Sequence, residues 1–211
     1  MILFFMFLQI LPAQEFFLYE TNADGKIGNL EITSRKDSLG YHILYTSDRT
    51  IEAILDSLDL RTLYVKKLVN GRQELKILNN KNFEVYFKGE KMVYQEDGPV
   101  YDRHTLDFAL RGFEYNHGYK KKIRVHIPEV MIVNAELMVV GEEVIKSPLG
   151  EIPCWKIEMT PRIFFIRKKL YFWFEKDYPH RFIKLSDASE KNQMLLINSI
   201  EYTPQPVDSS K

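Results

Sequence analysis

The chain is poor in cysteine, glycine and proline, and it carries no excess charge of either sign. Its single cysteine, Cys154, excludes an intrachain disulfide. Ten glycines and nine prolines among 211 residues are too few for a collagenous or disordered chain. The 29 basic and 29 acidic side chains cancel. This balance argues against a dedicated nucleic-acid-binding protein, because such proteins normally carry a basic excess.

Long apolar runs are also scarce, and the longest opens the chain at Met1–Leu11. It is shorter than the roughly 20 residues that a membrane-spanning helix needs. The run is typical of a secretory signal peptide, with cleavage after Ala13, although no Lys or Arg precedes it. The alternative is a buried N-terminal strand. We therefore predict a signal peptide over residues 1–13 and an exported protein of the bacterial periplasm or cell envelope, whose mature chain has no transmembrane helix.

Period-two alternation of apolar and polar residues dominates the rest of the chain, as in Ile123, Val125 and Ile127. The pairs Asp24-Gly25, Asn70-Gly71 and Lys88-Gly89 are suited to tight hairpin turns. Many short strands joined by such turns predict a mostly β fold with an antiparallel meander, hence a barrel or sandwich. We expect one domain over residues 14–202, followed by a flexible tail at 203–211.

One helix is predicted, at about residues 102–112. Asp102 can cap it, and Gly112 can end it. Its apolar stripe consists of Leu106, Ala109, Leu110 and Phe113. The stripe requires a hydrophobic surface, which the concave face of a curved sheet can supply. A separate run, Ile51–Leu58, fits both the helical and the strand period and stays ambiguous.

The order of these features resembles a known group of proteins. The hairpin at Asp24-Gly25 and the helix at 102–112 are followed by the turn Ser147–Gly150, Pro153-Cys-Trp-Lys-Ile157 and the aromatic run Tyr171–Asp177. This order is similar to that of the bacterial exported proteins grouped as domain of unknown function 3108 (DUF3108). The resemblance implies an antiparallel curved sheet, forming an open or partly closed β-barrel with the helix on its concave face. It also implies a shape like the half-barrels of periplasmic lipoprotein carriers, a strand at Ile51–Leu58, and no known catalytic residues.

Motifs for catalysis and metal binding are weak. The segment Glu20–Glu31 has the spacing of a calcium loop, but its first ligand is Glu and its flanks read as strands, so an ordinary hairpin is favoured. The histidines lack zinc-site spacing. His104 is expected near solvent in the first helical turn, His126 on a solvated strand face, and Cys154 as a buried, inert thiol. We therefore predict no catalytic residue, no metal and no cofactor.

The strand from Leu170 to Glu175 is apolar or aromatic on both faces, so one face must meet a helix, a ligand or a partner. The favoured hypothesis is a non-enzymatic envelope protein that binds a lipid or acyl chain in the barrel. The alternative is a filled barrel that serves as a structural or interaction module for an envelope protein or glycan; an enzyme is less favoured. The basic runs Lys120–Lys122 and Arg167–Lys169 are either solvated or in contact with anionic lipid headgroups. The predicted ligand-binding residues are Leu170, Phe172, Phe174, Leu106, Leu110 and Phe113.

Overall fold

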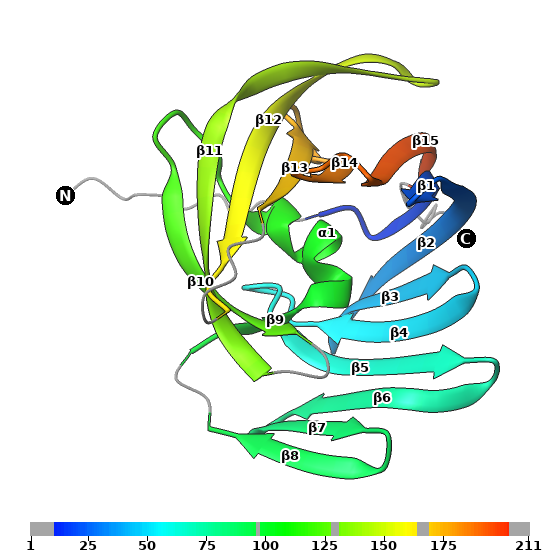
Figure 1. The fold of residues 1–211 in the computed structure, drawn as a ribbon, viewed down its shortest axis with the longest axis vertical. Helices are drawn as coiled ribbons and strands as arrows, with labels where there is room; N and C mark the ends of the chain where they lie inside the picture. Colours follow the sequence, from blue (N-terminus) through cyan, green and yellow to red (C-terminus); the bar gives the residue numbers. More distant parts are fainter. Residues whose placement is uncertain (1–10, 96–97, 128–130, 164–168, 203–211) are drawn as a thin grey trace, which may run out of the picture.

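The computed structural model describes residues 11–95, 98–127, 131–163 and 169–202. Most of the predicted signal segment, part of the aromatic and basic stretch (164–168) and the tail at 203–211 lie outside these ranges. The described residues form fifteen strands and one short helical segment (Figure 1). The strands are β1 (Gln14–Ala23), β2 (Lys26–Asp37), β3 (Gly40–Thr46), β4 (Arg49–Leu55), β5 (Thr62–Val69), β6 (Arg72–Asn79), β7 (Phe83–Phe87), β8 (Glu90–Tyr94), β9 (Val100–Asp102), β10 (Lys120–Ile127), β11 (Met131–Ser147), β12 (Gly150–Pro161), β13 (Leu170–Glu175), β14 (Phe182–Asp187) and β15 (Asn192–Tyr202).

All fifteen strands belong to one curved sheet. Its order is β8-β7-β6-β5-β4-β3-β2-β1-β15-β14-β13-β12-β11-β10-β9. Every neighbouring pair is antiparallel except β9 and β10, which are parallel. The first and last strands of the chain, β1 and β15, therefore pair in the middle of the sheet, and β8 and β9 form its two edges.

Local sequence explains the tight turns. Asp24-Gly25, Asn70-Gly71 and Lys88-Gly89 each have positive φ at both positions, with values of 50° and 87°, 50° and 73°, and 48° and 90°. Both central residues of a type I′ turn need this conformation, which matches the right-handed twist of the flanking strands. The hairpins predicted at these three pairs are confirmed. The first five residues of the ambiguous run, 51–55, lie in β4, as the resemblance implied, whereas residues 56–58 belong to the turn that follows.

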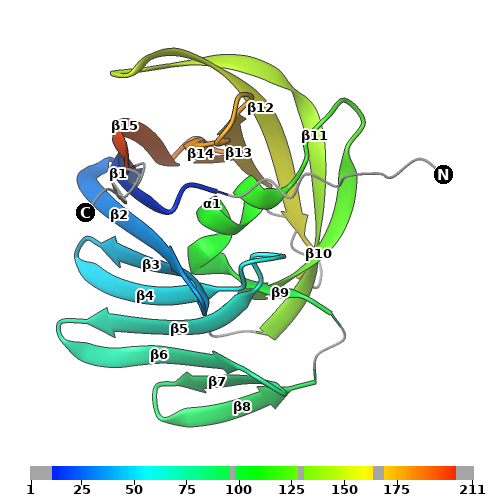
Figure 2. The same cartoon turned by 180° about the vertical axis from the view of Figure 1, so that it is seen from behind.

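Side chains rather than strand pairing close the sheet on itself. The β9 edge lies against the inner side of β5, where the Asp102 amide donates to Thr62 Oγ1 at 2.7 Å. Beside it, the Tyr101 hydroxyl donates to the Asp59 carbonyl at 3.2 Å. Strands β6, β7 and β8 extend beyond this contact (Figures 1 and 2). The predicted open or partly closed barrel is therefore confirmed.

The longest hairpin, β11–β12, curves across β13 and β14 toward β15 (Figure 1). A break in register between Val139 and Gly141 accompanies this bend, as is usual for a β-bulge. Ile145 and Ile152, near the end of the hairpin, are buried. The hairpin therefore covers part of the sheet as well as belonging to it.

Candidate functional site

A short helical segment fills the hollow of the sheet. It consists of the 3₁₀ turn η1 (Arg103–Thr105), the helix α1 (Leu106–Ala109) and the 3₁₀ turn η2 (Leu110–Gly112). Asp102 caps it, because its Oδ1 accepts the His104 amide at 3.0 Å. Figures 1 and 2 both show α1 between the β1–β5 half and the β10–β14 half of the sheet. The predicted helix on the concave face is confirmed, and we call the segment 103–112 the plug.

The plug is buried on more than its predicted apolar stripe. Leu106, Ala109, Leu110 and Phe113 are buried as the spacing predicts, and Phe108 is buried too. The Phe108 ring contacts the Tyr41 ring of β3, with centroids 5.5 Å apart. The Phe113 ring meets the Tyr101 ring edge-on at 5.9 Å. The plug therefore packs as a core element of the protein.

The predicted ligand-binding residues of β13 lie in the same hydrophobic core as the plug. The rings of Phe172 and Phe174 are nearly parallel, with centroids 6.3 Å apart. Both contact the Phe182 ring of β14, at 6.2 and 5.5 Å. Phe174 also stacks on Tyr115 at 5.6 Å. Leu170 is half-buried, whereas the other five predicted residues are buried. All six therefore lie in or against one apolar cluster.

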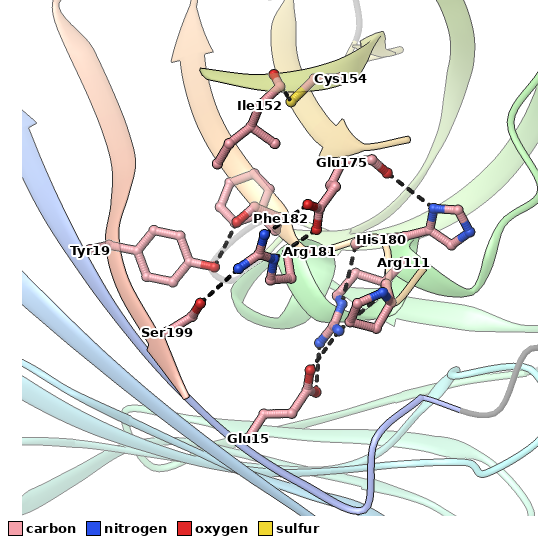
Figure 3. Close-up of polar contacts among 11 residues, drawn as sticks. Glu15, Tyr19, Arg111, Ile152, Cys154, Glu175, His180, Arg181, Phe182 and Ser199 are labelled. Atoms are coloured by element: carbon pink, nitrogen blue, oxygen red, sulfur yellow. Dashed lines mark hydrogen bonds and ion pairs between the residues drawn. The ribbon is translucent and has the colours of Figure 1, made fainter. Parts of the chain in front are cut away.

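A buried ion pair joins the plug to β1. Arg111 Nη1 and Nη2 donate to the two carboxylate oxygens of Glu15 at 2.8 and 2.7 Å (Figure 3). The guanidinium also donates to the carbonyls of His180 and Pro179, between β13 and β14. It lies over the Phe17 and Phe108 rings. Burial lowers the pKa of Arg111, but Glu15, together with Tyr19 and Glu201, raises it above its ordinary value overall, so the guanidinium stays charged.

The next polar contact of the plug involves Asp107, which has no ion-pair partner among the residues that the structure describes. Tyr45 of β3 donates its hydroxyl to Asp107 Oδ1 at 3.0 Å. Burial raises the pKa of Asp107 to about 7, although the Tyr45 hydrogen bond and the nearby Arg111 lower it. Burial also raises the pKa of Tyr45 well above its ordinary value, which keeps the hydroxyl protonated as a donor. This carboxyl therefore titrates near neutral pH.

The start of the plug is held by a carboxylate that bridges two histidines. Asp102 contacts the Nδ1 atoms of His104 and His126, each at 2.8 Å. Burial raises the pKa of Asp102, but the two histidine hydrogen bonds together lower it below its ordinary value. The Thr105 hydroxyl donates to the Asp102 carbonyl, and Phe83 of β7 packs on His126 with centroids 5.3 Å apart. This cluster joins the helical segment to β5, β7 and β10.

Two sequence expectations about histidine are wrong. His104 and His126 were expected in solvent, yet their side chains are 9% and 2% exposed. The polar alternation in β10 suggested a solvated face. However, Asp102 of the neighbouring strand β9 is the register partner of His126 and covers it. The burial comes from the parallel β9–β10 pair, which periodicity within one strand cannot reveal.

Lysine side chains cover the outer face of β13. Trp173 is 4% exposed, and the ammonium groups of Lys156 and Lys184 lie 5.1 and 4.9 Å from the centre of its ring. Its Nε1 donates to Glu143 Oε2 at 2.8 Å. Long lysine stems can cover aromatic surface while their charges stay in water. The second apolar face of this strand is therefore protected within the chain itself.

The structure gives no support to a reactive thiol or a calcium loop. Cys154 is buried as predicted, and burial, followed by the charge of Glu175, raises the pKa of its thiol to about 12. In the β1–β2 hairpin, Asn22 Oδ1 accepts the Gly25 amide at 2.8 Å, which closes an ordinary turn. Within the described ranges, no group of three or more His, Cys, Asp and Glu side chains could hold a metal ion.

Glu15 and Arg111 were not identified from sequence. Glu15 has the same period-two phase as Phe17 and Tyr19, whose side chains face inward, and that phase is a usable signal for an inward-facing acid. Arg111 has no such signal, because the short plug is buried on several sides. Its partner is 96 residues away in sequence.

Residues 19–192 match the sequence profile described as Protein of unknown function (DUF3108). The chain belongs to this family. The match covers most of the DUF3108 chain and confirms the resemblance drawn from its turns, helix and aromatic strand. None of the curated protein sequences compared with it matches the chain. In the described part of this DUF3108 protein, no helix is long and apolar enough to cross a membrane.

Solved structures support the fold. A β-barrel-like DUF1849 protein from Brucella abortus has a TM-score of 0.58 and 10% identity, covering 92% of the DUF3108 chain and 100% of its own. A DUF1329 family protein from Desulfovibrio piger has a TM-score of 0.29 and 12% identity, covering 92% and 88%. The Mycobacterium tuberculosis lipoprotein LppX has a TM-score of 0.28 and 15% identity, covering 93% and 90%. The first likeness shows a shared fold. The TM-scores of the other two are too low for a comparison of sites or ligands.

Proposed function

We propose that this protein is a non-enzymatic, exported envelope protein that binds an apolar ligand, a lipid or an acyl chain, on the concave face of its sheet. The observation that carries the proposal is the attachment of the plug. Its helical turns fill the concave face but are held there by side chains, through Glu15, Tyr45 and the histidine contacts of Asp102. The plug can therefore leave the face without breaking a strand pair of β1–β8 or β10–β15.

Displacement of the plug would uncover an apolar inner surface. Phe172, Phe174 and Phe182 form an aromatic cluster on β13 and β14. A ligand that replaced Leu106, Leu110 and Phe113 would restore apolar burial, at about 25 cal/mol per Å² before ordering costs. Export is supported by the apolar run Met1–Leu11 and the small residue Ala13. The absence of an enzymatic role is supported by the buried ionisable groups, which already contact other groups of the same chain.

Native mass spectrometry of the protein, purified from its own envelope without detergent, tests the proposal. We expect an added mass that is lost on extraction with organic solvent. Uptake of the apolar dye N-phenyl-1-naphthylamine should be faster in Glu15→Gln, which weakens the contact with Arg111, than in the unmodified chain. The matched control is Glu158→Gln, which removes a surface pair with Lys169. A bare polypeptide mass, with no dye uptake by folded protein, would contradict the proposal.

A second candidate is a filled barrel that acts as an interaction module of the envelope. The low exposure of Leu106, Leu110, Phe172 and Phe174, at 0–3%, favours it. In that case the dye should stay excluded from Glu15→Gln. Affinity purification should then recover one envelope protein together with the chain and no small molecule.

A further inference from the structure

The outer face of the sheet, on the side opposite the plug, has a hollow of about 440 Å³ across β1–β5. Strand register explains its shape, because its side chains come from two neighbouring cross-strand rows. The first row is Gln14, Arg35, His42, Ile54 and Tyr64, each paired with the next. The second row is Thr33, Leu44 and Glu52.

A second hollow, of about 390 Å³, lies in line with the first. It is lined by Leu78 and Glu84 with the turn residues 80–82. Tyr64 pairs with Leu78, and Leu78 pairs with Glu84, so the first row continues without a break from β1 to β7. Seven strands about 4.8 Å apart span roughly 29 Å. We call the two hollows and the row that joins them the outer track.

The outer track offers hydrogen-bonding groups that the chain does not use. The side chains of Gln14, Thr33 and Arg35 and the hydroxyl of Tyr64 have no hydrogen-bond or ion-pair partner among the described residues. By contrast, the inner-face charges of Arg111 and Glu15 are paired with each other, at 2.7 Å. The track therefore presents free donors and acceptors beside the apolar side chains of Leu44 and Ile54 and the ring of Tyr64.

The charges of the track cancel. Arg35 is opposed by Glu52 in the first hollow, and Lys81 by Glu84 in the second. His42 lies 2.9 Å from Asp37, and Glu52 lies 3.9 Å from Lys66. A strongly anionic or cationic ligand would meet a like charge in either hollow, so a neutral ligand is favoured.

We propose that the outer track binds a neutral oligosaccharide in an extended conformation. Each sugar hydroxyl is both donor and acceptor, which suits a mixture of amide, guanidinium, hydroxyl and carboxylate groups. The apolar faces of sugar rings can pack on Tyr64, which offers an aromatic body with a polar tip. This site lies on the opposite face from the plug and does not rest on the proposed lipid-binding function.

The test is a titration of the ¹⁵N-labelled full chain with chitotetraose, cellotetraose and maltotetraose, followed by amide chemical shifts. We expect at least one of them to shift amides of β2–β5. Tyr64→Ala and Arg35→Ala should each weaken that binding at least tenfold. Tyr171→Ala, a half-buried outer-face tyrosine of β13, and Arg72→Ala, an exposed arginine of β6, are the matched controls and should bind normally.

Three outcomes would overturn the proposal. The first is that none of the three sugars shifts these amides. The second is that binding persists unchanged in Tyr64→Ala and Arg35→Ala. The third is that only the acidic sugar tetragalacturonate binds, which would show an anion site instead. If Tyr64→Ala does not fold, Tyr64→Leu keeps apolar volume while removing the ring and hydroxyl, and it should show the same loss.

Discussion

Single charged residues in the interior determine how firmly the plug is held against the sheet. Arg111 and Glu15 are 1% and 0% exposed, so each charge depends on the other for compensation. A buried pair of this kind adds little compared with an apolar pair, but the loss of one partner leaves an uncompensated charge. The plug is therefore sensitive to single substitutions here and tolerant of matched ones.

We predict that Arg111→Met lowers the free energy of unfolding by about 3–5 kcal/mol, because Glu15 is then buried without its cation. The double variant Glu15→Leu/Arg111→Met should recover most of that loss. Urea denaturation followed by circular dichroism measures both values. Equal losses in the single and the double variant would show that packing, and not the unpaired charge, dominates.

Asp107 should make stability depend on pH. Burial raises its folded-state pKa to about 7, above the ordinary value of 3.8. Between these values the folded state binds more protons than the unfolded state, so the free energy of unfolding falls as pH rises from about 4 to about 7. The slope from this one group is on the order of 1 kcal/mol per pH unit. The neighbouring groups, Tyr45, Tyr19 and Arg111, do not titrate in this range.

Asp107→Asn isolates that slope, because the amide oxygen can still accept the Tyr45 hydrogen bond. Urea titrations at pH 5, 6, 7 and 8 should show the difference between the variant and the unmodified chain growing with pH in favour of the variant. Parallel stability curves for the two proteins would mean that Asp107 is ionised in the folded state throughout the range.

At this scale the sequence predicted apolar residues better than polar ones. The burial of Leu106, Leu110, Phe172 and Phe174 follows from period and composition. The burial of His126 does not, and the phase of Glu15 does not predict its partner, because each of these side chains is buried against a group that is distant in sequence. Periodicity indicates which face of an element is apolar, but it cannot predict the partner of a buried polar group when that partner lies on another element.

At the scale of elements, glycines with the same sign of φ serve different purposes. Gly71 has φ +73° in the β5–β6 turn, and a Cβ there would have open space. Gly40, at the start of β3, has φ +136°, and a Cβ there would overlap the Leu55 carbonyl oxygen of β4. The β2–β3 turn therefore requires glycine for packing as well as for conformation.

We predict that Gly71→Ala costs about 1–2 kcal/mol of unfolding free energy, the usual strain of a left-handed residue. Gly40→Ala should cost clearly more, roughly 3 kcal/mol or above, because the backbone of β4 must also move. Thermal and urea denaturation of the two variants, side by side, measure the difference. Similar losses would indicate that the end of β4 yields easily.

The elements themselves could largely be predicted, whereas their closure could not. Turns such as Asn70-Gly71 are local signals, and the strands around them follow from alternation. The contact of β9 with β5 joins Asp102 to Thr62 through a side-chain oxygen, 40 residues apart. The run Ile51–Leu58 is ambiguous for the same reason, because only the neighbours β3 and β5 decide that its first five residues form a strand.

At the scale of the whole molecule, the two ends of the sheet-forming chain meet, because β1 pairs with β15. The residues just before β1 contribute to this region. Leu11 is 2% exposed, and its carbonyl accepts the Tyr41 hydroxyl at 3.3 Å. The Ala13 carbonyl accepts the Lys36 amide at 2.7 Å. Residues 11–13 thus make core contacts, although the predicted signal peptide includes them.

Cleavage after Ala13 would therefore have a measurable cost. We expect a chain that begins at Gln14 to be less stable than one that begins at Leu11 by roughly 2–4 kcal/mol, from one buried leucine and its hydrogen bonds. N-terminal sequencing of the protein purified from its own cells shows which chain the cell makes, and the signal prediction expects Gln14 as its first residue. If the first residue is Leu11 or an earlier one, the predicted cleavage site is wrong and the protein retains Leu11 in its core. If it is Gln14, the protein folds without those contacts, and the space that Leu11 occupies is open to an apolar group from elsewhere.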